Sequence, residues 1–159
     1  MKTLKTSLWR VPLICLIAGF LWTPLMVRLL LRFAVTAPGV MDETISLVLH
    51  GGMTAAVLVL GGLFLLRGQT RRDIFLSASV AATYHIVLSL VQQLGGWTSG
   101  PAAVVFLRLY APLEWTSFPM LLLLRLFPQA DPGTLYLTLI SLPNYLVPYL
   151  FVPFGKKHA

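Results

Sequence analysis

Two long apolar stretches separated by a short basic turn dominate the hydrophobic pattern of this chain. Residues Ile45–Leu66 and Ile74–Leu94 are apolar over most of their length, and the turn between them, Arg67–Asp73, carries three arginines. A helix needs about 20 apolar residues to cross a hydrocarbon core of roughly 30 Å, so each stretch is long enough to span a membrane. The pattern predicts a transmembrane hairpin, and the positive-inside rule places its turn in the cytoplasm.

Three further apolar stretches predict three more spans. They cover residues 9–31, 102–127 and 134–152. The fold class that follows is all-α, a polytopic bundle of about five transmembrane helices in one membrane domain over residues 1–159. Pro112 and Pro119 interrupt the fourth stretch, because proline breaks the backbone hydrogen bonding of a helix. We interpret this stretch as one kinked helix, and the alternative is an interfacial piece followed by a shorter span.

The basic residues bear on the number of spans. With the Arg67–Asp73 turn in the cytoplasm, the basic N-terminal segment 2–10 is also inside, in agreement with the positive-inside rule. Five spans then place Lys156 and Lys157 outside, against that rule. Because late charges count less than those beside the first helices, we favour five spans, with four spans and both termini inside as the alternative.

The N-terminal segment also has features of a signal peptide. A basic start precedes an apolar run, and Ala34–Ala37 has the small residues of a cleavage site. The apolar run continues past the usual length, however, and Arg28 and Arg32 intervene before the small residues. We therefore interpret this segment as a retained first helix.

Small and capping residues predict how the central hairpin is built. Gly52 and Ala56 form a small-xxx-small pair of the kind that lets membrane helices approach closely. Small residues at positions 77, 78, 81 and 82 make a similar face on the next stretch. These faces predict that stretches 45–66 and 74–94 pack together at the centre of the bundle. Thr70 and Asp73 have the spacing of a capping box at the start of the second helix.

Composition agrees with a membrane protein. Of the 159 residues, 57% are hydrophobic and 11% are charged, whereas soluble domains carry about 25% charged residues. The net charge of +7 gathers at the ends of the apolar stretches, which is typical of contact with anionic lipid headgroups and not of nucleic-acid binding. The single cysteine, Cys15, lies in the first stretch and has no partner for a disulfide or a metal motif.

Four ionisable side chains inside the predicted spans are the candidate site residues, because such a group costs several kcal/mol within a membrane. At a rise of about 1.5 Å per residue, they lie below the outer edge by roughly 8 Å (His50), 10 Å (Arg108), 14 Å (His85) and 20 Å (Glu114). These depths predict one polar intramembrane cluster that opens outward, with Glu114 paired to Arg108 or to a histidine. The alternative is separate roles, in which Arg108 reaches the headgroups and the others join helices.

No motif for a cofactor or for a catalytic centre accompanies these residues. Two histidines and a glutamate are enough ligands for zinc, but here they occur singly on three stretches, without metal-ligand spacing. The chain has no Gly-rich phosphate loop and no nucleophile motif. We therefore expect no metal and no cofactor. The segment 142–149, with Pro143 and Pro148, has the broken-helix pattern that lines substrate sites in some transporters, or it is a kinked peripheral helix.

These patterns indicate a small membrane subunit that binds or passes a solute or an ion, or that supports a larger complex. Five short spans leave little room for a complete transporter, so we expect a homo-oligomer or a heterologous membrane partner. The alternative is a membrane-embedded enzyme acting on a lipid-linked substrate, with Glu114 and His85 as acid and base and Arg108 holding a phosphate. Low cysteine content and basic ends fit a bacterial inner membrane.

Overall fold

The computed structural model describes residues 7–36, 43–97, 100–128 and 134–157, and this part of the chain is helical, without a β-strand element. The all-α class predicted from the sequence is confirmed. The elements in chain order are α2 (Arg10–Thr36), α3 (Glu43–Leu60), the π-helix η1 (Gly61–Leu65), α4 (Arg71–Leu94), α5 (Gly100–Tyr110), the 3₁₀-helix η2 (Ala111–Thr116), α6 (Phe118–Leu126), α7 (Thr134–Ser141) and the 3₁₀-helix η3 (Leu142–Phe154).

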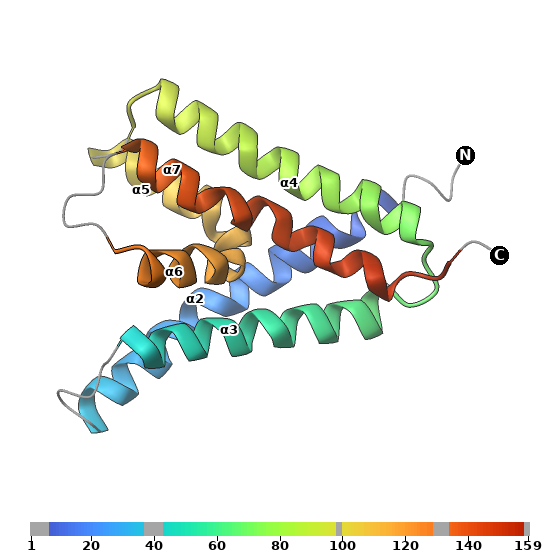
Figure 1. Cartoon of the computed structure of the whole chain (residues 1–159), viewed down its shortest axis with the longest axis horizontal. Coiled ribbons are helices and arrows are strands. Elements are labelled where there is room, and N and C mark those ends of the chain that lie inside the picture. Colours follow the sequence, from blue (N-terminus) through green and yellow to red (C-terminus); the bar gives the residue numbers. More distant parts are fainter. Residues whose placement is uncertain (1–6, 37–42, 98–99, 129–133, 158–159) are drawn as a thin grey trace.

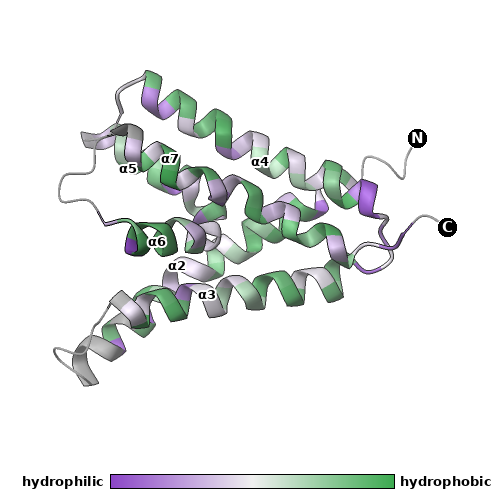
Figure 2. Cartoon of the chain, in the orientation of Figure 1, coloured by the Kyte–Doolittle hydropathy of each residue, from purple (hydrophilic) through white to green (hydrophobic). Residues whose placement is uncertain are grey.

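Four segments of the described residues are long and apolar enough to cross a membrane. They are Arg10–Leu29, Thr44–Leu65, Arg71–Leu94 and Tyr136–Phe154, with mean hydropathies between 1.4 and 1.9. Large apolar side chains on these segments remain exposed on the outside of the bundle, and Figure 2 shows the hydrophobic colour along α3 and α4. Such an extensive apolar exterior fits a multi-pass membrane protein covered by lipid.

The stretch 102–127 reverses direction instead of forming one kinked span. Figure 1 shows α5 running into the molecule and α6 running back toward the same end, with η2 at the turn. Pro112 and Pro119 lie at the starts of η2 and α6, where each removes a backbone donor and favours a new helix start. The prediction of a single kinked helix is therefore wrong. We call the α5–η2–α6 unit the re-entrant hairpin.

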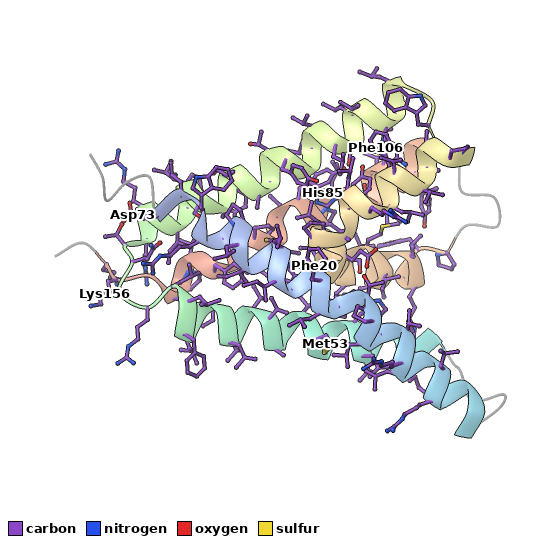
Figure 3. All side chains as sticks on the ribbon, turned by 180° about the vertical axis from the view of Figure 1, so that it is seen from behind. Phe20, Met53, Asp73, His85, Phe106 and Lys156 are labelled. Carbon is purple, nitrogen blue, oxygen red and sulfur yellow. The ribbon has the colours of Figure 1, made fainter. Side chains whose placement is uncertain are left out.

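The chain returns to the side of the α3–α4 turn at its C-terminal end. The amide of Lys156 donates to the carbonyl of Gln69 at 2.8 Å, and the amide of Arg71 donates to the carbonyl of Lys156 at 3.2 Å. Arg10 donates to the carbonyl of Leu65 at 3.0 Å, which brings the start of α2 to the same place. Figure 3 shows Asp73 and Lys156 together at this end.

We call this region the basic end, because it gathers Arg10, Arg67, Arg71, Arg72, Lys156 and Lys157. Lys2 and Lys5 lie outside the described residues. Four spans return the described chain to its starting side, so the charge conflict that five spans create does not arise. The four-span alternative agrees with the structure.

The tip of the re-entrant hairpin is buried in the core. Trp115 and Thr116 are both 0% exposed, and the ring of Trp115 packs on that of Phe151 with centroids 6.0 Å apart. Thr54 in α3 donates to the carbonyl of Trp115 at 2.7 Å. On the other side, Gly19 of α2 faces the hairpin backbone with no side chain between them. The tip therefore takes the central position in the bundle.

The hairpin predicted at residues 45–94 is present, but its two helices are not the packed centre. Figure 1 shows α3 and α4 on opposite sides of the molecule, with α2 and η3 between them. The small face of α4 packs on α2, where Ser77 donates to the carbonyl of Leu8 at 2.8 Å and accepts from the amide of Val11 at 2.9 Å. Gly52 has open space where a Cβ would project. α2 and η3 therefore separate α3 from α4 (Figure 1).

The helix start predicted at Thr70 is confirmed, but the Asp73 carboxylate accepts from the Thr70 hydroxyl, whereas in a capping box it accepts from the backbone amide. The hydroxyl oxygen of Thr70 accepts from the amide of Asp73 at 3.2 Å, and the same hydroxyl donates to the Asp73 carboxylate at 2.9 Å. Because the first amides of a helix have no partner within it, this contact satisfies one donor and defines where α4 begins.

Gly19→Ala is expected to destabilise the protein. A Cβ at this position would collide with the carbonyl oxygen of Ala111 and the Cα of Pro112, which are backbone atoms that cannot rotate away. Overpacking of this kind costs about 1–3 kcal/mol, so the melting temperature in detergent should fall. Gly52→Ala is the matched control, because it adds the same methyl group to open space and should not lower the melting temperature. Equal melting temperatures for the two variants would contradict the close contact.

Cysteine labelling tests the four-span topology. In a Cys15→Ala background, Arg67→Cys and Lys157→Cys should react with an impermeant maleimide from the same side of the membrane, and Trp97→Cys from the opposite side. The reason is that Lys156 pairs with the α3–α4 turn, whereas Trp97 follows the far end of α4. Labelling of positions 157 and 97 from one side would restore the five-span arrangement.

Candidate functional site

A polar cavity lies where α4, the end of α5, the start of α6 and the fourth span meet. Its volume is about 310 Å³. Nine of its eleven lining residues are polar, and none of the eleven is Asp, Glu, Lys or Arg. The nine are His85, Ser89, Gln92, Gln93, Tyr110, Thr138, Ser141, Asn144 and Tyr145. We call it the His85 cavity, and Figure 3 shows His85 on α4, on the side toward α5.

His85 lies between two tyrosine rings. Its imidazole is 4.5 Å from the ring of Tyr145 and 5.7 Å from the ring of Tyr110, both in edge-to-face geometry. Nδ1 is buried and has no hydrogen-bond partner in the part of the chain that the structure describes. Leaving a buried polar atom unpaired costs about 1–3 kcal/mol. The two tyrosine rings hold the imidazole in place by packing, and Nδ1 stays available for a hydrogen bond.

Ser89 joins three segments at the wall of the cavity. The hydroxyls of Tyr110 from α5 and Tyr145 from η3 each donate to Oγ of Ser89 at 3.0 Å. The serine hydroxyl lies one turn beyond His85 on α4, so it shares the face that carries the imidazole. Each tyrosine is therefore held at two points. Its hydroxyl bonds to Ser89, and its ring packs against the imidazole of His85.

Two amide side chains secure the rest of the lining. The side-chain oxygen of Asn144 accepts from the amide of Met120 at 3.1 Å, and the side-chain nitrogen of Gln93 donates to Oγ1 of Thr138 at 3.1 Å. Met120 lies in the first turn of α6, where backbone amides lack a partner within the helix. Asn144 therefore connects the re-entrant hairpin to the fourth span and satisfies a donor that has no partner within α6.

The four residues predicted as a cluster lie in different environments. Glu114 in η2 accepts from the hydroxyl of Thr23 at 2.6 Å. The ring of His50 packs on Trp22 at 5.2 Å, and Nδ1 lies 2.8 Å from the carbonyl oxygen of Ser46.

Arg108 is exposed on α5, and of the four residues His85 is the one that lines the cavity. In the described part of the chain, no hydrogen bond, ion pair or ring contact joins any two of Glu114, His85, His50 and Arg108. Glu114 and His50 instead contact consecutive residues of α2.

Sequence reasoning selected His85 and missed Ser89, Thr138 and Ser141 of the polar lining. A signal was present on α4, because Ser89 and Gln92 follow His85 by four and seven residues and so share its helical face. Asn144 and Tyr145 lie inside the segment 142–149, which the proline pattern did single out. Tyr110 lines the cavity because the chain reverses after α5, and hydropathy does not predict that reversal.

Comparisons with protein-family models, with curated proteins and with solved structures find no match for this chain. The described residues also contain no group of three or more His, Cys, Asp or Glu side chains placed to hold a metal ion. The functional argument therefore depends on the chemistry of the His85 cavity.

Asn144→Leu is expected to lower the melting temperature of the protein in detergent. The substitution removes the acceptor of the Met120 amide, and an unpaired buried donor costs about 1–3 kcal/mol. Leu146→Ala, on the exposed side of the same helix, provides a control that should change the melting temperature little. If both variants melt together with the wild type, Asn144 does not stabilise the hairpin.

Proposed function

We propose that this multi-pass membrane protein is a solute-binding subunit that takes a small, uncharged polar molecule into the His85 cavity. The observation that carries the proposal is the imidazole of His85, which lines a polar cavity while Nδ1 has no partner among the described residues. Polar groups left free within a membrane segment are costly and mark sites of function by default. A bound solute with hydroxyl or amide groups offers the partners that the cavity lacks.

The described lining residues carry no charged side chain, which favours an uncharged solute. None of the eleven lining residues is Asp, Glu, Lys or Arg. An ion transferred into a site of low dielectric constant without a countercharge meets a large desolvation cost. A neutral solute exchanges its hydrogen bonds with water for bonds to hydroxyl, amide and imidazole groups. The volume of about 310 Å³ is at the lower end of the range of roughly 300–1,000 Å³ that is typical of ligand sites.

The non-α geometry of the fourth span supports a role in solute passage. This span changes from α7 to the 3₁₀-helix η3 at Leu142, and the cavity lies on both sides of that change, at Thr138 and Tyr145. Interrupted helices commonly line the substrate sites of membrane transporters, because irregular backbone is tolerated where it borders a cavity. This reasoning favours a transport-type subunit over a purely structural one.

We further propose that the basic end faces the cytoplasm of a bacterial inner membrane. Six basic residues at that end fit the positive-inside rule. In this orientation His85 lies about 14 Å from the far end of α4, in the outer half of the membrane. Four spans enclose less space than five, so a second copy or a heterologous membrane subunit would complete a pathway.

The alternative of an acid–base enzyme receives no support from the geometry. Glu114 contacts Thr23 on α2, whereas His85 lies between tyrosines of α5 and η3. A general acid and a general base must both reach the reacting atoms, within about 3 Å or through one water molecule. The proposal of solute binding uses His85 without Glu114 or Arg108.

His85→Phe is expected to weaken solute binding. Ligand-observed NMR with glycerol, urea and inositol, against sodium and acetate ions, measures binding to the purified protein. At least one neutral probe should bind, and the variant should bind it about tenfold more weakly, the effect of losing one hydrogen bond of about 1.4 kcal/mol.

His50→Phe serves as the matched control, because His50 packs on Trp22 outside the lining of the His85 cavity. It should bind the probe as the wild type does. Binding of the ions alone, or equal binding by wild type and His85→Phe, would contradict the proposed function.

A further inference from the structure

The His85 cavity has an inner end and an outer end, because α4 and the fourth span run past it in opposite directions. On α4, His85 precedes Gln93 by eight residues, a rise of about 12 Å. The hydrogen bond from Gln93 to Thr138 joins the outer parts of the two segments. His85 and Ser89 contact Tyr145 at the inner parts. A solute in the cavity therefore meets different side chains at its two ends.

Asn144 offers hydrogen-bond donors at the inner end. This residue is 6% exposed, and its side-chain oxygen accepts from the backbone amide of Met120 at 3.1 Å. Because a backbone amide can only donate, this contact identifies which side-chain atom of Asn144 is the oxygen. No hydrogen bond joins Nδ2 to another residue in the described part of the chain. Both of its N–H groups are therefore left for a solute.

Ser89 adds a further donor at the inner end. Its Oγ accepts from the hydroxyls of Tyr110 and Tyr145, and these two bonds occupy both lone pairs of the oxygen. The hydrogen of Ser89 is therefore the part of its hydroxyl that remains for a solute. Nδ1 of His85 is a partner in either tautomer, because it donates when it carries the proton and accepts when it does not.

Two glutamines offer hydrogen-bond acceptors at the outer end. The side-chain nitrogen of Gln92 donates to the carbonyl of Trp97 at 3.4 Å, and that of Gln93 donates to Oγ1 of Thr138 at 3.1 Å. Because a carbonyl oxygen can only accept, the first contact identifies the nitrogen of Gln92. Among the residues with described positions, none donates to the side-chain oxygen of either glutamine. Each of these oxygens has two lone pairs for hydrogen bonding.

We propose that the His85 cavity recognises the carboxamide or urea group of a small neutral solute. The inference rests on the proposed function and adds the chemical class of the solute to it. The carbonyl oxygen of the solute accepts from Asn144 and Ser89 at the inner end, and its N–H groups donate to the glutamine oxygens at the outer end. Ser89 and Gln93 are separated by a rise of about 6 Å along α4, which two hydrogen bonds of about 2.9 Å and one small group can bridge.

An alcohol matches the two ends less well than a carboxamide does. A carboxamide is planar and holds its acceptor and its donors at fixed, separate positions. The oxygen of a single alcohol can accept from Asn144, but its one hydrogen then lies at the inner end, away from the glutamine oxygens. A polyol can reach both ends, but it must first order several rotatable bonds, which lowers its affinity.

Probes of nearly equal size separate the features of a carboxamide. Acetamide has a carbonyl oxygen and N–H groups, acetone has the carbonyl oxygen alone, 2-propanol has a hydroxyl, and acetate has a charge. Saturation-transfer NMR measures the binding of each to the protein in mild detergent, and the His85→Phe variant corrects for uptake by the detergent. Acetamide should bind about tenfold more tightly than acetone or 2-propanol, because each of these lacks a hydrogen bond that acetamide makes. Glycerol, as a polyol, should also bind more weakly than acetamide.

A double variant, Gln92→Met with Gln93→Met, tests the outer end. Methionine keeps the length of each side chain and removes both oxygens. The variant should bind acetamide about tenfold more weakly and acetone as the wild type does, because acetone has no N–H group to lose a partner. Thr83→Val is the control, because it removes a polar group from an exposed position of α4 outside the cavity. It should leave the binding of both probes unchanged.

The outcomes distinguish this inference from the proposed function. If 2-propanol or glycerol binds as tightly as acetamide and His85→Phe weakens that binding, the carboxamide assignment is overturned and the solute-binding function stands. The assignment is also overturned if the glutamine variant loses acetone and acetamide equally, or loses neither. If no neutral probe binds, or acetate alone binds, both the function and the assignment are wrong.

Discussion

The structure depends on the direct approach of two backbones, that of α2 at Gly19 and that of the hairpin tip at Ala111 and Pro112. This approach lets the re-entrant hairpin occupy the middle of the bundle. From that position α5 presents Tyr110 to His85, and α6 begins opposite α3. The His85 cavity is therefore a product of this packing contact, because its lining includes Tyr110 of α5 and Met120 of α6.

A chain reversal inside a membrane requires that its backbone groups find partners within the protein. The tip meets this requirement with nearby hydroxyls. Thr116 donates to the carbonyl of Leu113 at 2.6 Å, and Thr54 donates to that of Trp115 at 2.7 Å. The bulk of Trp115 and Phe151 fills the space around these bonds. Leu113, Trp115 and Thr116 of the tip are thus buried among the surrounding helices, whereas Ala111, Pro112 and Glu114 are partly exposed.

Hydropathy was sufficient to predict the class and the spans that cross in one piece, because the length of an apolar run is a local property. It failed at residues 102–127, since a proline kink and a reversal leave the same apolar pattern and differ only in tertiary contacts. The charges of Lys156 and Lys157 distinguish a kink from a reversal. One kinked span would place both lysines opposite the other basic residues, whereas a reversal places them on the same side, as the positive-inside rule favours. For the site, the cost of an ionisable group inside a span selected His85 together with Glu114, His50 and Arg108. The contacts of Tyr110 with His85 and of Glu114 with α2 depend on the reversal, which that argument does not predict.

The re-entrant hairpin enters and leaves at the same end of the molecule, so the two halves of the protein differ in cross-section. Away from the basic end, the described chain adds α5 and α6 to the four candidate spans, and toward the basic end the spans stand without them (Figure 1). A wedge of this shape occupies more area in one monolayer than in the other.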